Sequence, residues 1–124
     1  MTGFHPLDGA RYLRGVGTDE RIVGLVAFHS CALMEAEERG LNADLAAEFD
    51  REQSAVSDAL CYCDMTTGPE GQRLTVEERL AEIQKRYGPG HLVSRFVRRA
   101  YPEIVAASQR TERHCGLSMR SDKG

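Results

Sequence analysis

Long apolar runs are missing from this sequence, in which no stretch of about 18 or more apolar residues occurs. The N-terminal stretch MTGFHPLDGARYLRG also lacks the basic start and the apolar centre of a secretory signal. These absences argue against a membrane-spanning segment and against export. We therefore expect a soluble, cytoplasmic protein that does not bind membranes.

Cysteine is sparse as well, with four residues at positions 31, 61, 63 and 115. They are too few and too scattered for the disulfide framework of a small secreted domain, so reduced thiols are expected. The formal net charge is only -3, which gives no overall electrostatic attraction to nucleic acid or to an anionic membrane. We expect no nucleic-acid partner.

What the chain does have is helical periodicity. Its 124 residues with 41% apolar content suit one compact domain. No region alternates apolar and polar residues for long enough to compete as a strand, whereas apolar residues recur at helical spacing through most of the chain. The sequence therefore predicts an all-α fold, with a single domain over residues 1–112 and a flexible tail over 113–124.

The first two predicted helices cover residues 6–14 and 18–39. The first begins with Pro6, which is favourable in a first helical turn. The second carries an apolar face and acidic residues in its first turn. Gly24 and the polar pair Ser30-Cys31 leave open whether this segment is one helix or two.

Three more helical segments follow. The stretch 44–65 reads as one long amphipathic helix with a single apolar stripe. The stretch LTVEERLAEIQKRYGPG has a capping box, formed by Thr75 and Glu78, and a Gly-Pro-Gly stop. The last segment starts near Leu92, and Pro102 is expected to break it into two pieces. The stripe of the 44–65 helix consists of Phe49, Val56, Leu60 and Cys63.

The stretch LCYCDMTTGP, residues 60–69, places Asp64 directly after a Cys-x-Cys sequence. Residues two apart on a helix point about 200° from each other, so Cys61 and Cys63 are expected to pack rather than to share a zinc ion. Asp64 lies beside the predicted stripe, near a helix end whose dipole disfavours negative charge. It therefore needs a partner: the MTTGP turn, an arginine or a metal ion.

Two histidines are also candidate metal ligands. His29 stands among apolar residues in IVGLVAFHS, where a satisfied core histidine and a metal ligand both remain open. His5 precedes Pro6 at a helix entrance, where its ring can turn toward a neighbouring helix. Mixed nitrogen and oxygen donors from successive helices suit divalent first-row metals, so His5, His29 and Asp64 form a candidate ligand set.

Three stretches, TGFHPLDGARYLR, IVGLVAFHS and DALCYCDMTTGPEGQRLTVEERLAEIQKRYG, resemble in that order the later part of a bacterial HD-domain protein of the metal-dependent phosphohydrolase superfamily. The likeness covers residues 2–112. It implies an HD-domain-like bundle of about five to seven helices. In the family's pattern His5 and His29 match two intermediate histidines, and Asp64 matches the closing aspartate.

The resemblance also implies a cofactor and a chemistry. The cofactor would be a divalent metal, namely Mn, Fe, Co, Ni, Zn or Mg. The reaction would be hydrolysis of a phosphate ester, such as a nucleotide or another small phosphorylated substrate, by water that the metal activates.

The chain departs from the family's pattern at its front. No adjacent His-Asp pair occurs, and only four residues precede His5, so the early histidine and the His-Asp doublet of the family are absent. The resemblance thus implies an N-terminally truncated member with half a metal site, incomplete as this chain alone. The alternative is a non-catalytic remnant that acts as a binding or oligomeric scaffold.

Loss of the family's first helices would expose apolar surface on the 18–39 and 44–65 segments. A monomer rarely leaves a large apolar strip uncovered. We therefore expect a homodimer, or a domain-swapped pair, that covers this strip.

A cationic helix face is the last candidate site. Arg95, Arg98 and Arg99 are three and four residues apart, so together they could bind a phosphate group or an acidic partner. An ordinary solvated face is the alternative. Phe96 and Tyr101 are the only aromatic residues nearby, which argues against a nucleic-acid platform.

Overall fold

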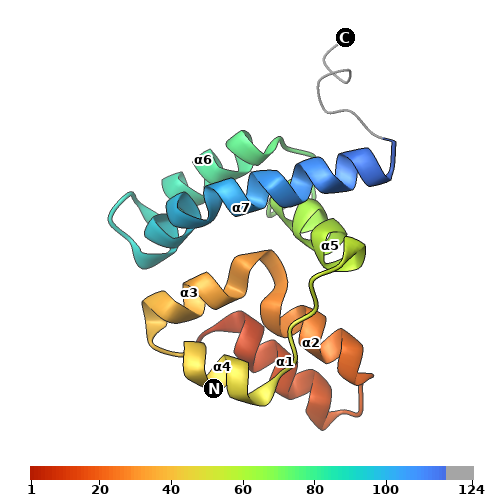
Figure 1. Cartoon of the computed structure of the whole chain (residues 1–124). Helices are drawn as coiled ribbons and strands as arrows, with labels where there is room; N and C mark the ends of the chain where they lie inside the picture. The colour runs from red at the N-terminus through yellow and green to blue at the C-terminus, as the bar shows by residue number, and fades with distance from the viewer. Residues whose placement is uncertain (117–124) are drawn as a thin grey trace. The chain divides into compact units, whose positions relative to one another are not determined.

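A computed structural model describes residues 1–116 of the chain, and within them the structure is all-α, as predicted (Figure 1). None of the helices in this range combines the length and the apolar character needed to cross a lipid bilayer. The predicted tail over 113–124 lies mostly outside the described residues, and its first two residues are still helical. The elements are α1 (His5–Gly15), α2 (Glu20–Phe28), the short 3-10 turn η1 (His29–Cys31), α3 (Ala32–Arg39), α4 (Asn42–Glu48), α5 (Ala55–Met65), α6 (Val76–Tyr87) and α7 (Leu92–His114).

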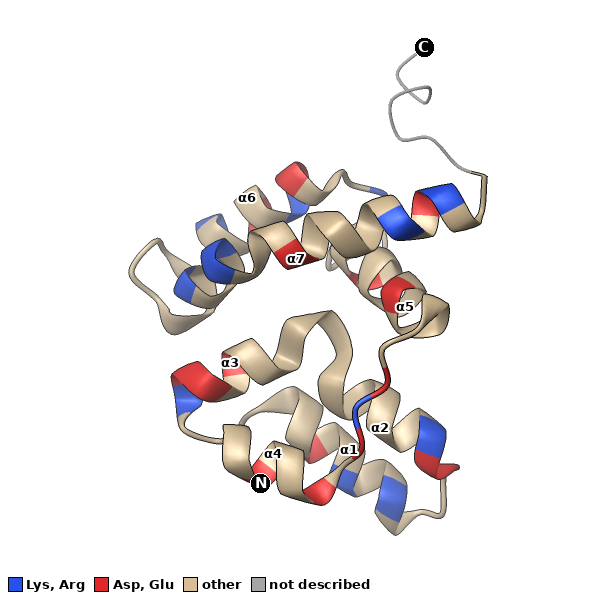
Figure 2. Cartoon of the chain, in the orientation of Figure 1, with Lys and Arg blue, Asp and Glu red and all other residues tan. Residues whose placement is uncertain are grey.

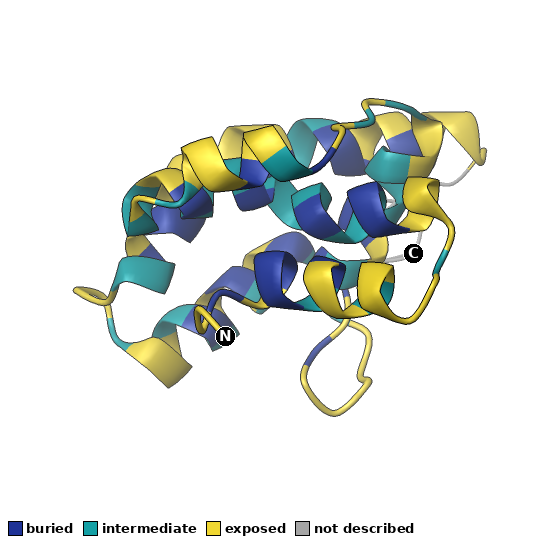
Figure 3. Cartoon of the chain, turned by 90° about the horizontal axis from the view of Figure 1, so that it is seen from below, coloured by how far each residue is buried: buried dark blue, intermediate teal, exposed yellow. Residues whose placement is uncertain are grey.

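The chain divides into two compact units, residues 1–52 and residues 53–124. We call them the N-terminal unit and the C-terminal unit, and we describe each by itself. Buried and exposed residues alternate along the helices of both units in the manner of amphipathic helices (Figure 3). The predicted single domain over 1–112 stays a prediction.

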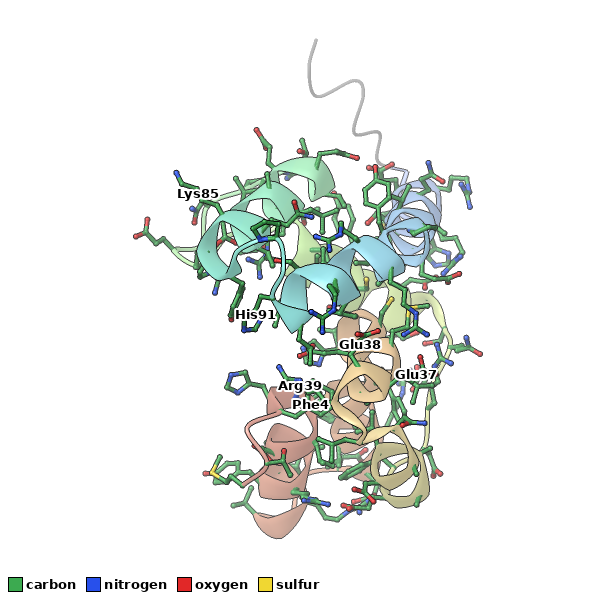
Figure 4. The ribbon with its side chains drawn as sticks, turned by 90° about the vertical axis from the view of Figure 1, so that its left-hand side faces the viewer. Phe4, Glu37, Glu38, Arg39, Lys85 and His91 are labelled. Atoms are coloured by element: carbon green, nitrogen blue, oxygen red, sulfur yellow. The ribbon has the colours of Figure 1, made fainter. Side chains whose placement is uncertain are left out.

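The N-terminal unit contains α1 to α4 around one apolar core. The connection over 16–19 is short, so α1 and α2 pack as antiparallel neighbours, and α3 packs against α4. Arg39 of α3 lies across the ring of Phe4, with 5.4 Å between the guanidinium carbon and the ring centroid (Figure 4). The buried core residues are Phe4, Leu7, Ala10, Val23, Ala27, Ala32, Ala36, Leu45 and Phe49.

Asp8 fastens the first residues of the chain to α1. Its carboxylate accepts hydrogen bonds from the Thr2 backbone N–H at 2.9 Å, from the Thr2 hydroxyl at 2.8 Å and from the Gly3 N–H at 2.8 Å. The hydrogen bond from the Thr2 backbone contributes most to a pKa of Asp8 below its ordinary value, and the other two act in the same direction. This arrangement holds Phe4, just before α1, in the core.

The segment predicted over 18–39 is split in the structure. Ser30 and Cys31 have φ angles of 53° and 61°, in the left-handed region that residues other than glycine rarely occupy. The chain therefore turns sharply between α2 and α3. Gly40, with φ of 73°, ends α3 as the sequence predicted.

The prediction of one helix over 44–65 is wrong. Helix α4 ends at Glu48, and Phe49 has extended backbone and is buried in the N-terminal unit. A capping box formed by Ser54 and Ser57 then starts α5. The predicted stripe is wrong too. The break separates Phe49 from the other three members, and α5 buries a different face: Val56 and Cys63 are exposed, and Cys61, Tyr62 and Met65 are buried.

The C-terminal unit packs α5 and α6 against the long helix α7. The predicted capping box of α6 is confirmed, since the Thr75 hydroxyl accepts from the Glu78 N–H at 3.1 Å and the Glu78 carboxylate accepts from the Thr75 N–H at 2.8 Å. Gly88 follows the helix end, also as predicted. The buried apolar residues are Cys61, Tyr62, Met65, Val76, Leu80, Ile83, Phe96, Val97, Ala100, Ile104 and Ala107.

The predicted break at Pro102 is wrong as well. Helix α7 runs without interruption from Leu92 to His114, with Pro102 inside it. Pro102 has no N–H to donate to the Arg98 carbonyl, and both residues lie on the exposed side of the helix. Buried residues on both sides of Pro102 keep one register, and their packing holds the helix together.

Candidate functional site

His29 lies directly after α2, half-buried, with its ring turned back onto that helix. Its Nδ1 atom is 2.6 Å from the Val26 carbonyl oxygen. A carbonyl only accepts, so Nδ1 carries the hydrogen, and in the neutral ring Nε2 keeps its lone pair. Histidines that bind metals commonly donate their other N–H to a backbone carbonyl in this way. The same hydrogen bond would also be made by a histidine that only packs in the core. The geometry is therefore compatible with a metal ligand and with a core histidine.

The backbone that follows His29 is unusual. Ser30 and Cys31 are consecutive non-glycine residues with positive φ. Such conformations cost free energy and are found preferentially at active sites and ligand-binding sites. They place His29 at a sharp corner between α2 and α3, where an uninterrupted helix would not have put it.

His5 is the first residue of α1, and its side chain is exposed. Since α1 and α2 are antiparallel neighbours, the start of α1 lies at the same end of the pair as the end of α2. His5 and His29 are therefore at one end of the N-terminal unit. The buried residues on either side of His5, Phe4 and Pro6, fix the backbone there.

Asp64 is half-buried in the last turn of α5, in the C-terminal unit. The Thr66 and Thr67 hydroxyls donate to the Tyr62 and Cys63 carbonyls at 2.6 and 2.7 Å. Arg79 Nε donates to the backbone carbonyl of Asp64 at 3.3 Å. A cation therefore does lie at this negative end of the helix dipole, and it is an arginine. The role of the Asp64 carboxylate as a metal ligand stays a prediction.

The cysteines of LCYCDMTTGP point apart, as helical geometry predicted. Cys61 is buried and Cys63 is exposed. Within the described residues, none of the four cysteines, which include Cys31 and Cys115, forms a disulfide. The expectation that Cys61 and Cys63 both pack is wrong for Cys63, which is exposed.

The cationic face of α7 holds the connection between α6 and α7. Arg95 donates to the Gly90 carbonyl at 2.7 Å, and Arg98 donates to the Pro89 carbonyl at 3.0 Å. Figure 2 shows lysine and arginine gathered where α6 ends and α7 begins. Arg99 is exposed on the same helix. Gly90 and Pro89 supply neutral carbonyls in these two contacts, and phosphate binding at this face stays a prediction.

His91 is a residue whose role the sequence reasoning missed. Its Nδ1 atom accepts from the Val93 N–H at 3.0 Å, so the side chain caps α7 (Figure 4). Histidine is not among the preferred capping residues. Its place directly after Gly-Pro-Gly and before the apolar Leu92 is the signal that could have indicated the cap.

The predicted ligands do not add up to a complete metal site within either unit. His5 and His29 belong to the N-terminal unit and Asp64 to the C-terminal unit. Over residues 1–116, no group of three or more histidine, cysteine, aspartate or glutamate side chains is placed to hold a metal ion. The residues present fit one or two ligand positions, and we derive no hydrolytic step for this chain.

Comparison with known proteins adds no further residue to the site. No family model, no curated protein and no solved structure matches the chain. The resemblance to the HD-domain superfamily therefore rests on the motifs in the sequence.

Proposed function

We propose that the chain is an HD-domain-like, cytoplasmic metal-binding protein related to phosphohydrolases, and that His29 is one of its ligands. The geometry of His29 carries this proposal. The contact between Nδ1 and the Val26 carbonyl fixes the tautomer that leaves Nε2 free to bind an ion. The resemblance supports His5 and Asp64 as the other ligands that this chain contributes.

A bound divalent ion would supply a water of lowered pKa and would neutralise charge on phosphoryl oxygens. The chain's own contribution is narrower. His29 offers one imidazole nitrogen at a fixed corner, and His5 offers a second from the start of α1. With so few ligands, we expect weak metal binding and no hydrolysis of a phosphate ester unless another protein supplies the remaining ligands.

The test is a calorimetric titration of the metal-free full-length chain with Mn²⁺ and with Zn²⁺. We expect weak binding that His29→Ala weakens at least about tenfold, because the variant loses a direct ligand. His114→Ala, which changes an exposed histidine in the C-terminal unit, is the matched control and should leave the affinity unchanged. Equal affinities for the parent chain and His29→Ala would remove His29 from the site.

Asp64 needs a separate variant, because its carboxylate lies in the other unit. If it is a ligand, Asp64→Ala lowers the metal content of the purified protein. Circular dichroism of the variant shows whether α5 is intact. An unchanged metal content would exclude Asp64 as a ligand.

A binding or oligomeric scaffold is the second candidate function. It is favoured by Ile22, a large aliphatic side chain on α2 that is 49% exposed. Together with the expected apolar strip, this exposure supports a homodimer. A chain that binds neither metal up to millimolar concentration would leave only this function.

A further inference from the structure

A groove lies within the C-terminal unit, between the first turns of α5 and the last turns of α7. Its volume is about 430 Å³, within the range of small-molecule sites, about 300–1,000 Å³. It involves neither the histidines of the N-terminal unit nor Asp64, so it is independent of the proposed metal site. The lining residues used below are Ala55, Val56, Asp58, Ala59, Arg110 and Thr111.

Apart from Asp58, the wall formed by α5 is apolar. Ala55 and Ala59 are one helical turn apart, and their small side chains leave the space that the groove occupies. Val56 between them is 47% exposed, although it is a large aliphatic residue. This surface offers hydrophobic contact to a ligand and no hydrogen bonds.

The charged residues of the groove neutralise each other. Arg110 donates from Nε and from Nη2 to the two carboxylate oxygens of Asp58, at 2.8 and 3.0 Å. The hydrogen bond to Asp58 also raises the pKa of Arg110, so the pair stays ionised and joined. A charged ligand would have to break this bidentate pair, which favours an uncharged one.

Thr111 supplies a buried polar group, beside His114 and Cys115, which also line the groove. It is 5% exposed, and its hydroxyl oxygen is buried without a hydrogen-bond partner. Ser108, one turn earlier, shows the usual solution, since its hydroxyl donates to the Ile104 carbonyl at 2.9 Å. Helical threonine adopts two side-chain rotamers, so the Thr111 hydroxyl can take a second position. A ligand oxygen in the groove would then give Thr111 the partner that it lacks.

We propose that this groove binds a small, uncharged, mainly apolar molecule that carries one hydroxyl or carbonyl group, and that Thr111 forms the hydrogen bond to that group. The apolar part of the ligand lies on Val56 and the two alanines. The ion pair between Asp58 and Arg110 remains closed beside it. This inference goes beyond metal binding and stands whether or not the metal proposal holds.

The test is a titration of the ¹⁵N-labelled full-length chain with 1-octanol, followed by amide chemical shifts. We expect saturable shifts confined to residues 55–59 and 110–115. Octanoate, which has a similar apolar chain and a negative charge, should bind at least about tenfold more weakly, because its carboxylate would lose water without gaining a cation, Arg110 being already paired with Asp58. Shifts spread over the chain, or equal affinity for octanoate, would overturn the proposal.

Two pairs of variants locate the ligand. Thr111→Val keeps the shape of the side chain and removes the hydroxyl, so it should weaken 1-octanol binding about tenfold without lowering the melting temperature of the free protein. Ala59→Leu fills the groove and should abolish binding, whereas Ala81→Leu, at an exposed position of α6, should not. Unchanged binding by Thr111→Val or by Ala59→Leu contradicts the proposal.

Other occupants of the groove would show themselves in the ligand-free protein. Shifts at residues 55–59 that depend on protein concentration would assign the groove to a second copy of the chain. Nuclear Overhauser contacts between Val56 and residues 117–124 would assign it to the chain's own C-terminal end. Either result would replace the small-molecule proposal.

Discussion

Gly24 lies in α2 where the helix passes close to the chain backbone after α4. A Cβ atom at this position would be 2.6 Å from the Asp50 carbonyl oxygen, a backbone atom that cannot move aside cheaply. Gly9 in α1 is a useful contrast, because a Cβ atom there would be 3.6 Å from a methyl group of Val26, an ordinary contact. The close backbone of Asp50 thus requires glycine at position 24, whereas the packing around position 9 would accept alanine.

We predict that Gly24→Ala destabilises the protein by about 1–3 kcal/mol, the usual range for overpacking. Gly9→Ala should instead stabilise it by about 0.5–1 kcal/mol, because alanine is the better helix former. Urea denaturation of the two variants and the parent chain measures both effects. Equal stabilities of the two variants would show that Asp50 does not approach Gly24 as the structure has it.

Asp8 makes the stability of the N-terminal unit depend on pH. Its pKa lies below the ordinary value of 3.8, chiefly because the Thr2 N–H donates to the carboxylate. A carboxyl group whose pKa is lower in the folded state contributes stability above its unfolded pKa, and loses it as the pH falls through the folded pKa.

We therefore predict that Asp8→Asn lowers the melting temperature at pH 7, and that its difference from the parent chain shrinks as the pH falls below 3.8. Asp44→Asn, at an exposed position of the same unit, controls for the loss of one negative charge. A difference for Asp8→Asn that stays constant from pH 7 to pH 3 would contradict the role of these hydrogen bonds.

At the scale of elements, the long helix α7 shows packing overriding a local breaker. Proline costs about 3 kcal/mol in a helix interior. The residues Ala100 and Ile104 on either side of Pro102 are nevertheless both fully buried, which requires a continuous register. Their burial compensates for the proline.

We predict that Pro102→Ala stabilises the C-terminal unit by up to about 3 kcal/mol, because it restores the hydrogen bond to the Arg98 carbonyl and removes the steric conflict. Glu103→Ala, at the next exposed position, should change the stability by less than about 0.5 kcal/mol. Thermal unfolding followed at 222 nm compares the two. A destabilised Pro102→Ala would mean that α7 depends on a bend that alanine does not preserve.

At the scale of the whole molecule, the association of the chain with a second copy of itself is the property to test. Ile22 on α2 lies in the segment expected to form a dimer contact, and it is 49% exposed. Val16, in the connection before α2, is 61% exposed and lies outside that segment. Substitution of Ile22 therefore tests the dimer contact, and the same substitution of Val16 is its control.

Light scattering at micromolar concentration should show a dimer for the parent chain and for Val16→Glu. Ile22→Glu should shift the protein to a monomer, because a buried, unpaired carboxylate is costly. A stable monomer of the parent chain would remove the dimer proposal. Dissociation by both variants would point to general unfolding, which circular dichroism would detect.

The sequence determined much of the local structure. Helical periodicity indicated the all-α class, and the Thr75 and Glu78 capping box and Gly40 marked helix ends correctly, because these signals act between residues close in the chain. The spacing of Cys61 and Cys63 predicted that they point apart, but it placed Cys63 on the buried stripe, whereas Cys61 is the buried one and Cys63 is exposed.

Only the tertiary structure decided the rest. The break at Phe49 and the continuity of α7 through Pro102 depend on which core each segment packs against, and sequence spacing does not contain that information. For the candidate site too, the sequence supplied the residues and the tertiary structure decided their placement. The sequence named His5, His29 and Asp64 as a set, but folding assigned them to two units and fixed the tautomer of His29 through a backbone carbonyl. The groove beside Thr111 arises from two helices about fifty residues apart in the chain, so it depends on long-range packing alone.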